Sequence, residues 1–274
     1  MISLSQYIIG LKEARIVPFG KTGSSARFGQ CVVLAGGPGT GKGFIRQNYL
    51  NTDYKTFNVD DLKGLYVKMK EKGVIDDEDE YDFKKPEDVA KLHAKVKEKG
   101  WKEKERARVF SGSDKNKLPN ICFDITCKEI GDLNDILQYT VPLGYYVTLV
   151  WVVGNVDVAA ENNKKRSRTV PESLLRKTHN AVNKFIPELL SNKYKEESKH
   201  INAAYVALSA GNGRVLSDEW KDTPILPVKK NGGEFDYGSV KDKVEKFQKE
   251  EQPVDNNPKK KKKWVSKWDG VSED

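Results

Sequence analysis

The sequence predicts a three-layer α/β fold built on a parallel sheet of about five strands. Short apolar runs alternate along the chain with stretches of helical periodicity, an order typical of a parallel sheet covered by helices on both faces. The expected strands are residues 31–35, 55–59, 120–125, 145–153 and, with a weaker pattern, 203–209. The expected helices between them are residues 43–50, 61–72, 128–137 and 171–190.

Three segments are expected to flank or interrupt this core domain, which we place at residues 31–228. Residues 1–30 predict a short amphipathic helix at 3–16, followed by a Gly/Ser-rich connector. Residues 63–117 are rich in charge and predict a helical insertion at the rim of the sheet. Residues 229–274 predict a polar helix followed by a disordered basic tail.

The charge of the chain favours polyanionic partners. Its formal charge is +8, from 48 Lys and Arg against 40 Asp and Glu. Such a balance suits nucleotides or nucleic acid, or serves solubility alone. The run Lys259–Lys263 with Trp264 and Trp268 suits phosphate neutralisation and base stacking, and it equally suits a solvated end. The partner of the tail therefore stays open at this point.

The cysteines and the hydropathy indicate a cytoplasmic protein. The three cysteines are odd in number and form no C-x-x-C pair, which favours a reducing compartment without a disulfide framework. No run reaches the roughly 18 apolar residues that a bilayer crossing requires, and no secretory signal is visible at the start. We therefore expect no membrane partner.

A phosphate-binding loop follows the first expected strand. Residues 36–42 match the G-x-x-x-x-G-K pattern and lie between a strand and a helix, which is the context that this pattern requires. Glycines let backbone N–H groups surround a phosphate, and the next helix presents its positive end. The expected nucleotide-binding residues, for ATP, are Gly36, Gly37, Pro38, Gly39, Thr40, Gly41, Lys42, Gly43 and Phe44.

One position departs from the usual loop. The residue after the lysine is normally Ser or Thr, whose hydroxyl holds Mg²⁺. Here Gly43 and Phe44 follow Lys42, whereas adenylate kinases have glycine and then threonine. We expect Mg²⁺ to be held by water, phosphates and a carboxylate elsewhere, or the activity to be weak.

Three further polar segments follow in order along the chain. Residues 58–63 read Asn-Val-Asp-Asp-Leu-Lys and come at the end of the second strand. Residues 120–126 read Asn-Ile-Cys-Phe-Asp-Ile-Thr and end the third strand. Residues 162–172 are basic and contain Arg-Ser-Arg-Thr-Val-Pro. With the loop, these segments resemble the zeta-toxin and polynucleotide-kinase branch of P-loop kinases, over about residues 31–190.

The resemblance implies a role for each segment. Asp60 corresponds to the general base that faces the acceptor hydroxyl, and Lys63 replaces an arginine that contacts the acceptor. Asp61 is expected to cap the following helix. Asp124 would hold Mg²⁺ through water or bind the acceptor, with Thr126 beside it.

The basic segment corresponds to a lid, which we place at residues 162–171. Closing it would bring positive charge onto the transferred phosphoryl group. Arg166 and Arg168 are the expected catalytic residues of the lid, and Lys165 is expected to contact substrate.

The sequence therefore predicts an ATP-dependent kinase acting on a hydroxyl of a nucleic acid end, a nucleotide or a nucleotide sugar. The motifs do not separate these acceptors, and the oligomeric state stays open. The competing hypothesis is a nucleotide-binding interaction protein with weak or no phosphotransfer, which docks a nucleic acid or a protein through its basic tail.

Overall fold

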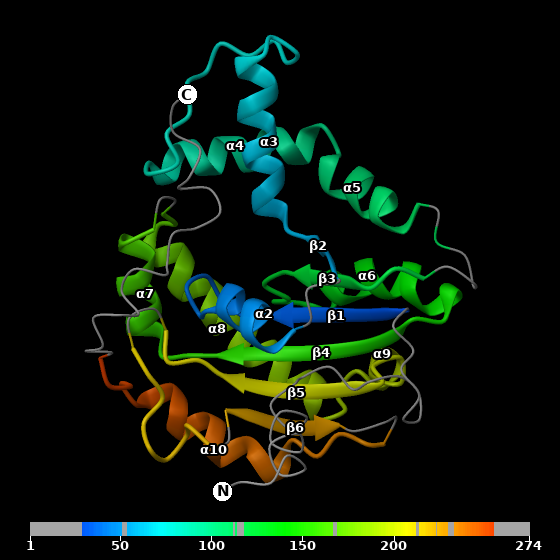
Figure 1. Ribbon diagram of the computed structural model, residues 1–274, viewed down its shortest axis with the longest axis vertical. Helices are drawn as coiled ribbons and strands as arrows, with labels where there is room; N and C mark the ends of the chain where they lie inside the picture. The colour runs from blue at the N-terminus through cyan, green and yellow to red at the C-terminus, as the bar shows by residue number, and fades with distance from the viewer. Residues whose placement is uncertain are drawn as a thin grey trace, which may run out of the picture.

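The computed structural model describes residues 29–50, 54–111, 113, 118–166, 169–211, 214–222, 224–229 and 233–254. Its centre is a six-stranded sheet in the order β2-β3-β1-β4-β5-β6. The strands are β1 (Gln30–Ala35), β2 (Lys55–Phe57), β3 (Ile121–Asp124), β4 (Tyr146–Val153), β5 (Ala203–Leu208) and β6 (Ile225–Lys229). All neighbours pair in parallel except β6, which is antiparallel to β5. The carboxyl ends of β1 to β5 therefore share one edge, on the left of the sheet in Figure 1.

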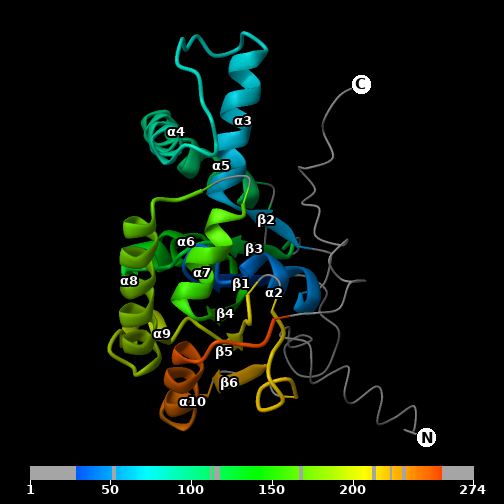
Figure 2. The same ribbon diagram turned by 90° about the vertical axis from the view of Figure 1, so that its left-hand side faces the viewer.

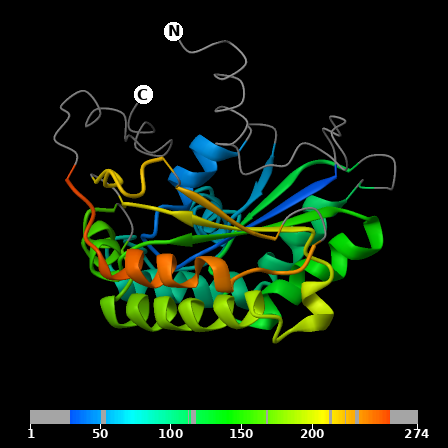
Figure 3. The ribbon, with the colours of Figure 1, turned by 90° about the horizontal axis from the view of Figure 1, so that it is seen from below.

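Helices connect the strands and cover the sheet. They are α2 (Lys42–Tyr49), α3 (Val59–Glu71), α4 (Pro86–Glu98), α5 (Trp101–Phe110), α6 (Ile130–Leu143), α7 (Val156–Lys164), α8 (Glu172–Leu190), α9 (Lys195–Ser198) and α10 (Gly238–Lys249). Helices α6, α8 and α10 lie on one face of the sheet and α2 lies on the other (Figures 2 and 3). The chain therefore has the three-layer arrangement that its sequence predicts.

The core follows from the alternation of side chains along the strands. Val33 and Phe123 belong to a large buried cluster that also contains Leu133 of α6 and Ile186 of α8. Val32 and Cys122, one position away, point to the opposite face and belong to a smaller cluster with Ile45 of α2. Both faces are thus apolar, as expected for parallel strands covered on both sides. Among the described residues, no helix combines the length and the apolarity needed to cross a bilayer.

The five predicted strands are all present, with small differences at their ends. Strand β2 stops at Phe57 because Asn58 caps α3, so residues 58–63 form a helix start and not a strand end. Strand β6 was not predicted: its exposed Pro227 interrupts the apolar pattern, and proline is tolerated at an edge strand. The predicted helix at 3–16 and the tail beyond residue 254 lie outside the described residues.

Helices α3, α4 and α5 project from the β2 edge of the sheet (Figure 1). Leu62, Tyr66, Leu92 and Val96 form a separate buried cluster among them. Asp77 ties the acidic loop to this cluster, because its carboxylate accepts the hydroxyl hydrogens of Tyr66 (2.6 Å) and Tyr81 (2.7 Å). These hydrogen bonds hold the pKa of Asp77 well below its usual range. At least one acidic residue of the predicted insertion, Asp77, therefore has a structural role.

Candidate functional site at the carboxyl edge of the sheet

The glycine loop leaves β1 and enters α2 in a shape that fits a phosphate. Gly39 and Gly41 have positive φ angles of 82° and 89°, which glycine adopts without strain. The start of α2 has no side-chain cap and no acidic residue in its own first turn, so neither of these neutralises its positive end. Lys42 Nζ donates to the carbonyl oxygens of Gly36 (2.8 Å) and Gly37 (3.2 Å) and so lies over the loop.

Neighbouring segments hold the loop closely. A Cβ atom on Gly39 would lie 2.6 Å from the carbonyl oxygen of Ala159 in α7, and one on Gly41 would lie 2.3 Å from Ser209 Oγ after β5. The N–H of Gly36 donates to the carbonyl of Thr126 at 3.1 Å. Thr126, predicted to contact substrate, therefore also supports the loop through its backbone. Helix α7 and the ends of β3 and β5 thus enclose the loop on several sides.

His179 of α8 contacts the loop, and this contact was not predicted from the sequence. Its imidazole is buried, and its Nε2 lies 2.8 Å from the carbonyl oxygen of Pro38. Because a carbonyl oxygen only accepts, Nε2 carries the hydrogen. The ring lies so close that a Cβ on Gly37 would be 2.4 Å from it. Burial, and then the charges of Lys42 and Arg176, lower the pKa of His179 and favour the neutral ring.

Replacing His179 by glutamine is expected to reduce the loss of stability in acid. The folded state lowers the pKa of His179, so the unfolded chain binds the proton more readily, and stability is lost as the pH falls below about 6.5. Glutamine retains an amide donor for Pro38 but does not titrate. Urea unfolding of both proteins between pH 8 and pH 5 measures the difference. If the free energy of unfolding changes with pH by the same amount in both proteins, burial does not lower the pKa of His179 as expected.

Asp124 and two basic residues meet beside the loop. Strand β3 pairs with β1 so that Asp124 lies opposite Leu34, at the carboxyl ends of both strands. Lys42 Nζ and Arg46 Nη1 each lie 3.9 Å from one oxygen of the Asp124 carboxylate. Lys42 and Asp124 are both predicted site residues, although the contact between them was not predicted. Arg46 was not predicted, although its position four residues after Lys42 places both side chains on one helix face.

The protein donors do not fit a magnesium site made of several side chains. Gly43 and Phe44 lack a hydroxyl, and the Thr40 hydroxyl already donates to the carbonyl of Gly37 at 2.9 Å. No group of three or more acidic, histidine or cysteine side chains suited to a metal occurs among the described residues. The metal ligand predicted from the sequence is Asp124, and its carboxylate already contacts Lys42 and Arg46.

Asp60 lies in the first turn of α3, after the strand next to β3. Strands β2 and β3 pair in parallel, so Asp60 and Asp124 follow neighbouring strands at the same edge. The N-cap of α3 is Asn58, whose side chain accepts from the Asp60 N–H at 2.9 Å, and the expected capping by Asp61 is corrected accordingly. Lys63 is nearly buried, and its Nζ contacts Asp60 Oδ1 at 3.2 Å. This ion pair joins the predicted base to the predicted acceptor-binding lysine.

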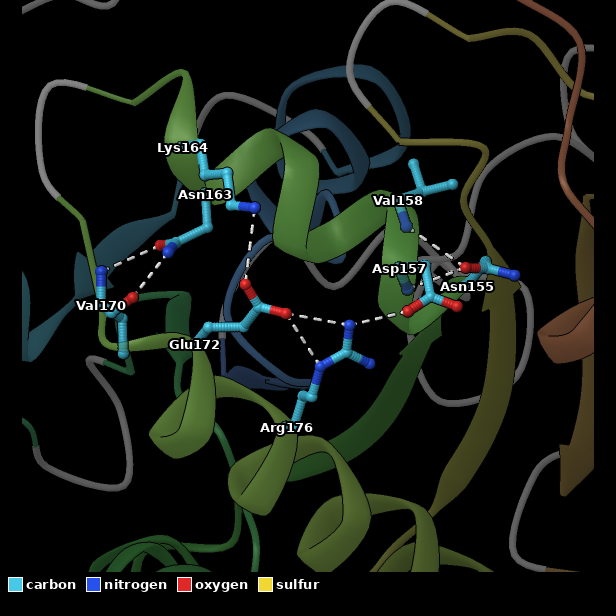
Figure 4. Close-up of polar contacts among 8 residues, drawn as sticks. All are labelled: Asn155, Asp157, Val158, Asn163, Lys164, Val170, Glu172 and Arg176. Carbon is cyan, nitrogen blue, oxygen red and sulfur yellow. Dashed lines mark hydrogen bonds and ion pairs between the residues drawn. The ribbon is translucent and has the colours of Figure 1, made fainter.

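The predicted lid is the connection between α7 and α8, and both of its ends are fixed. Asn163 closes a pair of hydrogen bonds with the backbone of Val170, of 2.6 and 3.0 Å (Figure 4). Below it, Arg176 of α8 contacts Asp157 at 2.8 Å and Glu172 at 3.0 Å. Thr169 donates through its N–H and hydroxyl to two carbonyl oxygens of the loop before α4, those of Phe83 and Lys84.

The basic residues of the lid occupy the part between these fixed ends. Lys165 and Arg166 are exposed at the end of α7. Arg168 lies outside the described residues, so its predicted role stays a prediction. The lid and the projecting helices are joined through Thr169, a connection that the sequence did not indicate.

Comparison with known proteins gives distant similarities of fold. No protein-family model and no curated protein sequence matches the chain. A solved structure from the PezAT chromosomal toxin–antitoxin system of Streptococcus pneumoniae matches with a TM-score of 0.45 and 14% identity, covering 74% of this chain and 76% of that one. The AvrRxo1-ORF1:AvrRxo1-ORF2 structure with sulphate ions matches with a TM-score of 0.47 and 12% identity, over 88% of this chain and 70% of that one.

A further AvrRxo1-ORF1:-ORF2 structure, with ATP, matches with a TM-score of 0.44 and 11% identity, over 88% of this chain and 70% of that one. All three of these solved structures match with a TM-score below 0.5 and with 14% identity or less. Similarities this distant do not carry an argument about activity. The function is therefore argued from the residues of this chain.

Proposed function

We propose that the chain is an ATP-dependent kinase that transfers the γ-phosphate to a hydroxyl of a nucleic acid end, a nucleotide or a nucleotide sugar. The observation that carries the proposal is the uncapped start of α2 beneath a glycine loop, with Lys42 over it and Asp60 at the same edge of the sheet. A phosphate site and a carboxylate base at one edge are the two parts that phosphoryl transfer to a hydroxyl needs.

The proposed reaction uses these groups in the following way. The loop and Lys42 hold the β- and γ-phosphates. The acceptor oxygen bonds to the γ-phosphorus while the bond from that phosphorus to the bridging oxygen breaks, and ADP leaves. Asp60 takes the proton of the hydroxyl and orients the oxygen for in-line attack. Lid charge from Arg166 and Arg168 stabilises the negative charge on the transferred group.

One observation supports a transfer to a hydroxyl. Transfer to a phosphate needs no proton acceptor, whereas Asp60 supplies one next to the nearly buried Lys63. The absence of a hydroxyl at Gly43 and Phe44 favours the second candidate, a nucleotide-binding protein with weak or no transfer.

Labelled phosphate from ATP is expected to appear on an acceptor in the wild-type protein and to be reduced by about 10²–10³-fold in Lys42→Met, because the charge next to the phosphates is lost. The acceptor panel contains a 5′-hydroxyl oligonucleotide, a nucleoside monophosphate and a nucleotide sugar. Lys55→Met, an exposed lysine of β2, is the matched control and should retain wild-type activity. Tight ATP binding without product on any acceptor would favour the nucleotide-binding protein instead.

A further inference from the structure

Two cations on α2 reach the same carboxylate. Lys42 and Arg46 lie one helical turn apart, and the Asp124 carboxylate lies 3.9 Å from each. The side chains of Lys42 and Asp124 are 14% and 10% exposed, and that of Arg46 is 32% exposed. The guanidinium is therefore the more accessible of the two cations.

Arg46 contacts a carboxylate of the kind that binds Mg²⁺ in other P-loop proteins. In such proteins the hydroxyl after the loop lysine and a carboxylate after a neighbouring strand bind Mg²⁺ on either side. Here the carboxylate is present as Asp124, and the hydroxyl is replaced by Gly43. The partner that Asp124 has instead, besides Lys42, is the Arg46 guanidinium.

We propose that Arg46 is a second phosphate-binding cation of the loop, so that nucleotide binding by this chain does not require a divalent metal. This proposal rests on the proposed function only in taking the loop ligand to be a nucleoside triphosphate. When the triphosphate enters, the planar N–H groups of Arg46 bind phosphate oxygens two at a time, while the guanidinium stays beside Asp124. Asp124 then holds the guanidinium in place, so that it positions a cation of the protein and not a metal ion.

The direct test is ATP affinity in Mg²⁺ and in EDTA, measured by calorimetry on the full chain. The affinity of the wild-type protein is expected to change by less than about fivefold between the two buffers, because the loop hydroxyl that makes Mg²⁺ a partner of the protein is missing. A loss of more than about fivefold in EDTA overturns the proposal.

Two variants separate Arg46 from a structural role. Arg46→Gln is expected to weaken ATP binding by about tenfold or more, while Arg108→Gln, an exposed arginine of α5, should leave the affinity unchanged. Gly43→Ser restores the hydroxyl at a place where a Cβ meets no atom within 4 Å. It is expected to bind ATP more tightly in Mg²⁺ than in EDTA. Unchanged affinity in Arg46→Gln, or no metal effect in Gly43→Ser, contradicts the assignment.

Melting curves without nucleotide confirm that each variant is folded. The ATP affinities of these variants test the role of Arg46 independently of phosphotransfer, because calorimetry measures binding alone. Metal-independent ATP binding without any labelled acceptor would reject the kinase and leave the role of Arg46 intact. Product formation with strongly metal-dependent binding would retain the kinase and reject the role of Arg46.

Discussion

Asp60→Asn is expected to lower the rate of phosphoryl transfer by about 10²–10⁴-fold while leaving ATP affinity nearly unchanged. The proposed base accepts the proton of the attacking hydroxyl, and an amide cannot do so at neutral pH. Asparagine has the same shape, and the N-cap of α3 is made by Asn58, so the helix start is preserved. The measurement is the single-turnover rate of label transfer beside ATP affinity from calorimetry.

Asp61→Asn is the matched control for this prediction. Asp61 follows Asp60 in the same first turn of α3, and its side chain is exposed. The two substitutions remove the same negative charge from the same helix start, so the change in the interaction with the helix dipole should be equal, and Asp60→Asn additionally loses the ion pair with Lys63. Transfer that falls equally in both variants, or that persists in Asp60→Asn, would reject Asp60 as the base.

Much of the fold could be predicted because each signal is local. The apolar run before the loop forms β1, and the loop itself needs glycine at positions that are left-handed in the structure, such as Gly39 and Gly41. The contact between Lys42 and Asp124 was not predicted, and it arises because the loop and Asp124 lie at the carboxyl ends of the neighbouring parallel strands β1 and β3. Parallel topology converts an order of motifs along the chain into proximity at one edge.

The supports of the site could not be predicted because they depend on tertiary approach. His179 contacts Pro38 across 141 positions of sequence, and a lone histidine in an amphipathic helix carries no mark of such a contact. Asn163 belongs to the predicted lid, and its amide forms two hydrogen bonds with the backbone of Val170 that the sequence did not indicate. The spacing of Arg46 from Lys42 predicts that both side chains lie on one face of the helix. The sequence does not indicate that this face meets Asp124.

Gly39→Ala is expected to destabilise the protein by about 2–5 kcal/mol and to weaken ATP binding more than about tenfold. Its φ of 82° strains any residue with a Cβ, and the new methyl group would meet the Ala159 carbonyl oxygen at 2.6 Å. That oxygen belongs to the backbone of α7, so it cannot turn away as a flexible side chain would. The loop must therefore shift, and its backbone N–H groups no longer point toward the phosphates.

Gly43→Ala is the control that isolates this effect. It adds the same methyl group four residues later, in helix α2, where a Cβ meets no atom within 4 Å. Alanine there should be neutral or should stabilise the helix by up to about 1 kcal/mol. Urea unfolding and ATP calorimetry on both variants separate the addition of a methyl group from its place in the loop. A Gly39→Ala protein as stable as wild type, with equal ATP affinity, would show that α7 does not enclose the loop closely, and the positioning of the phosphates would then need another cause.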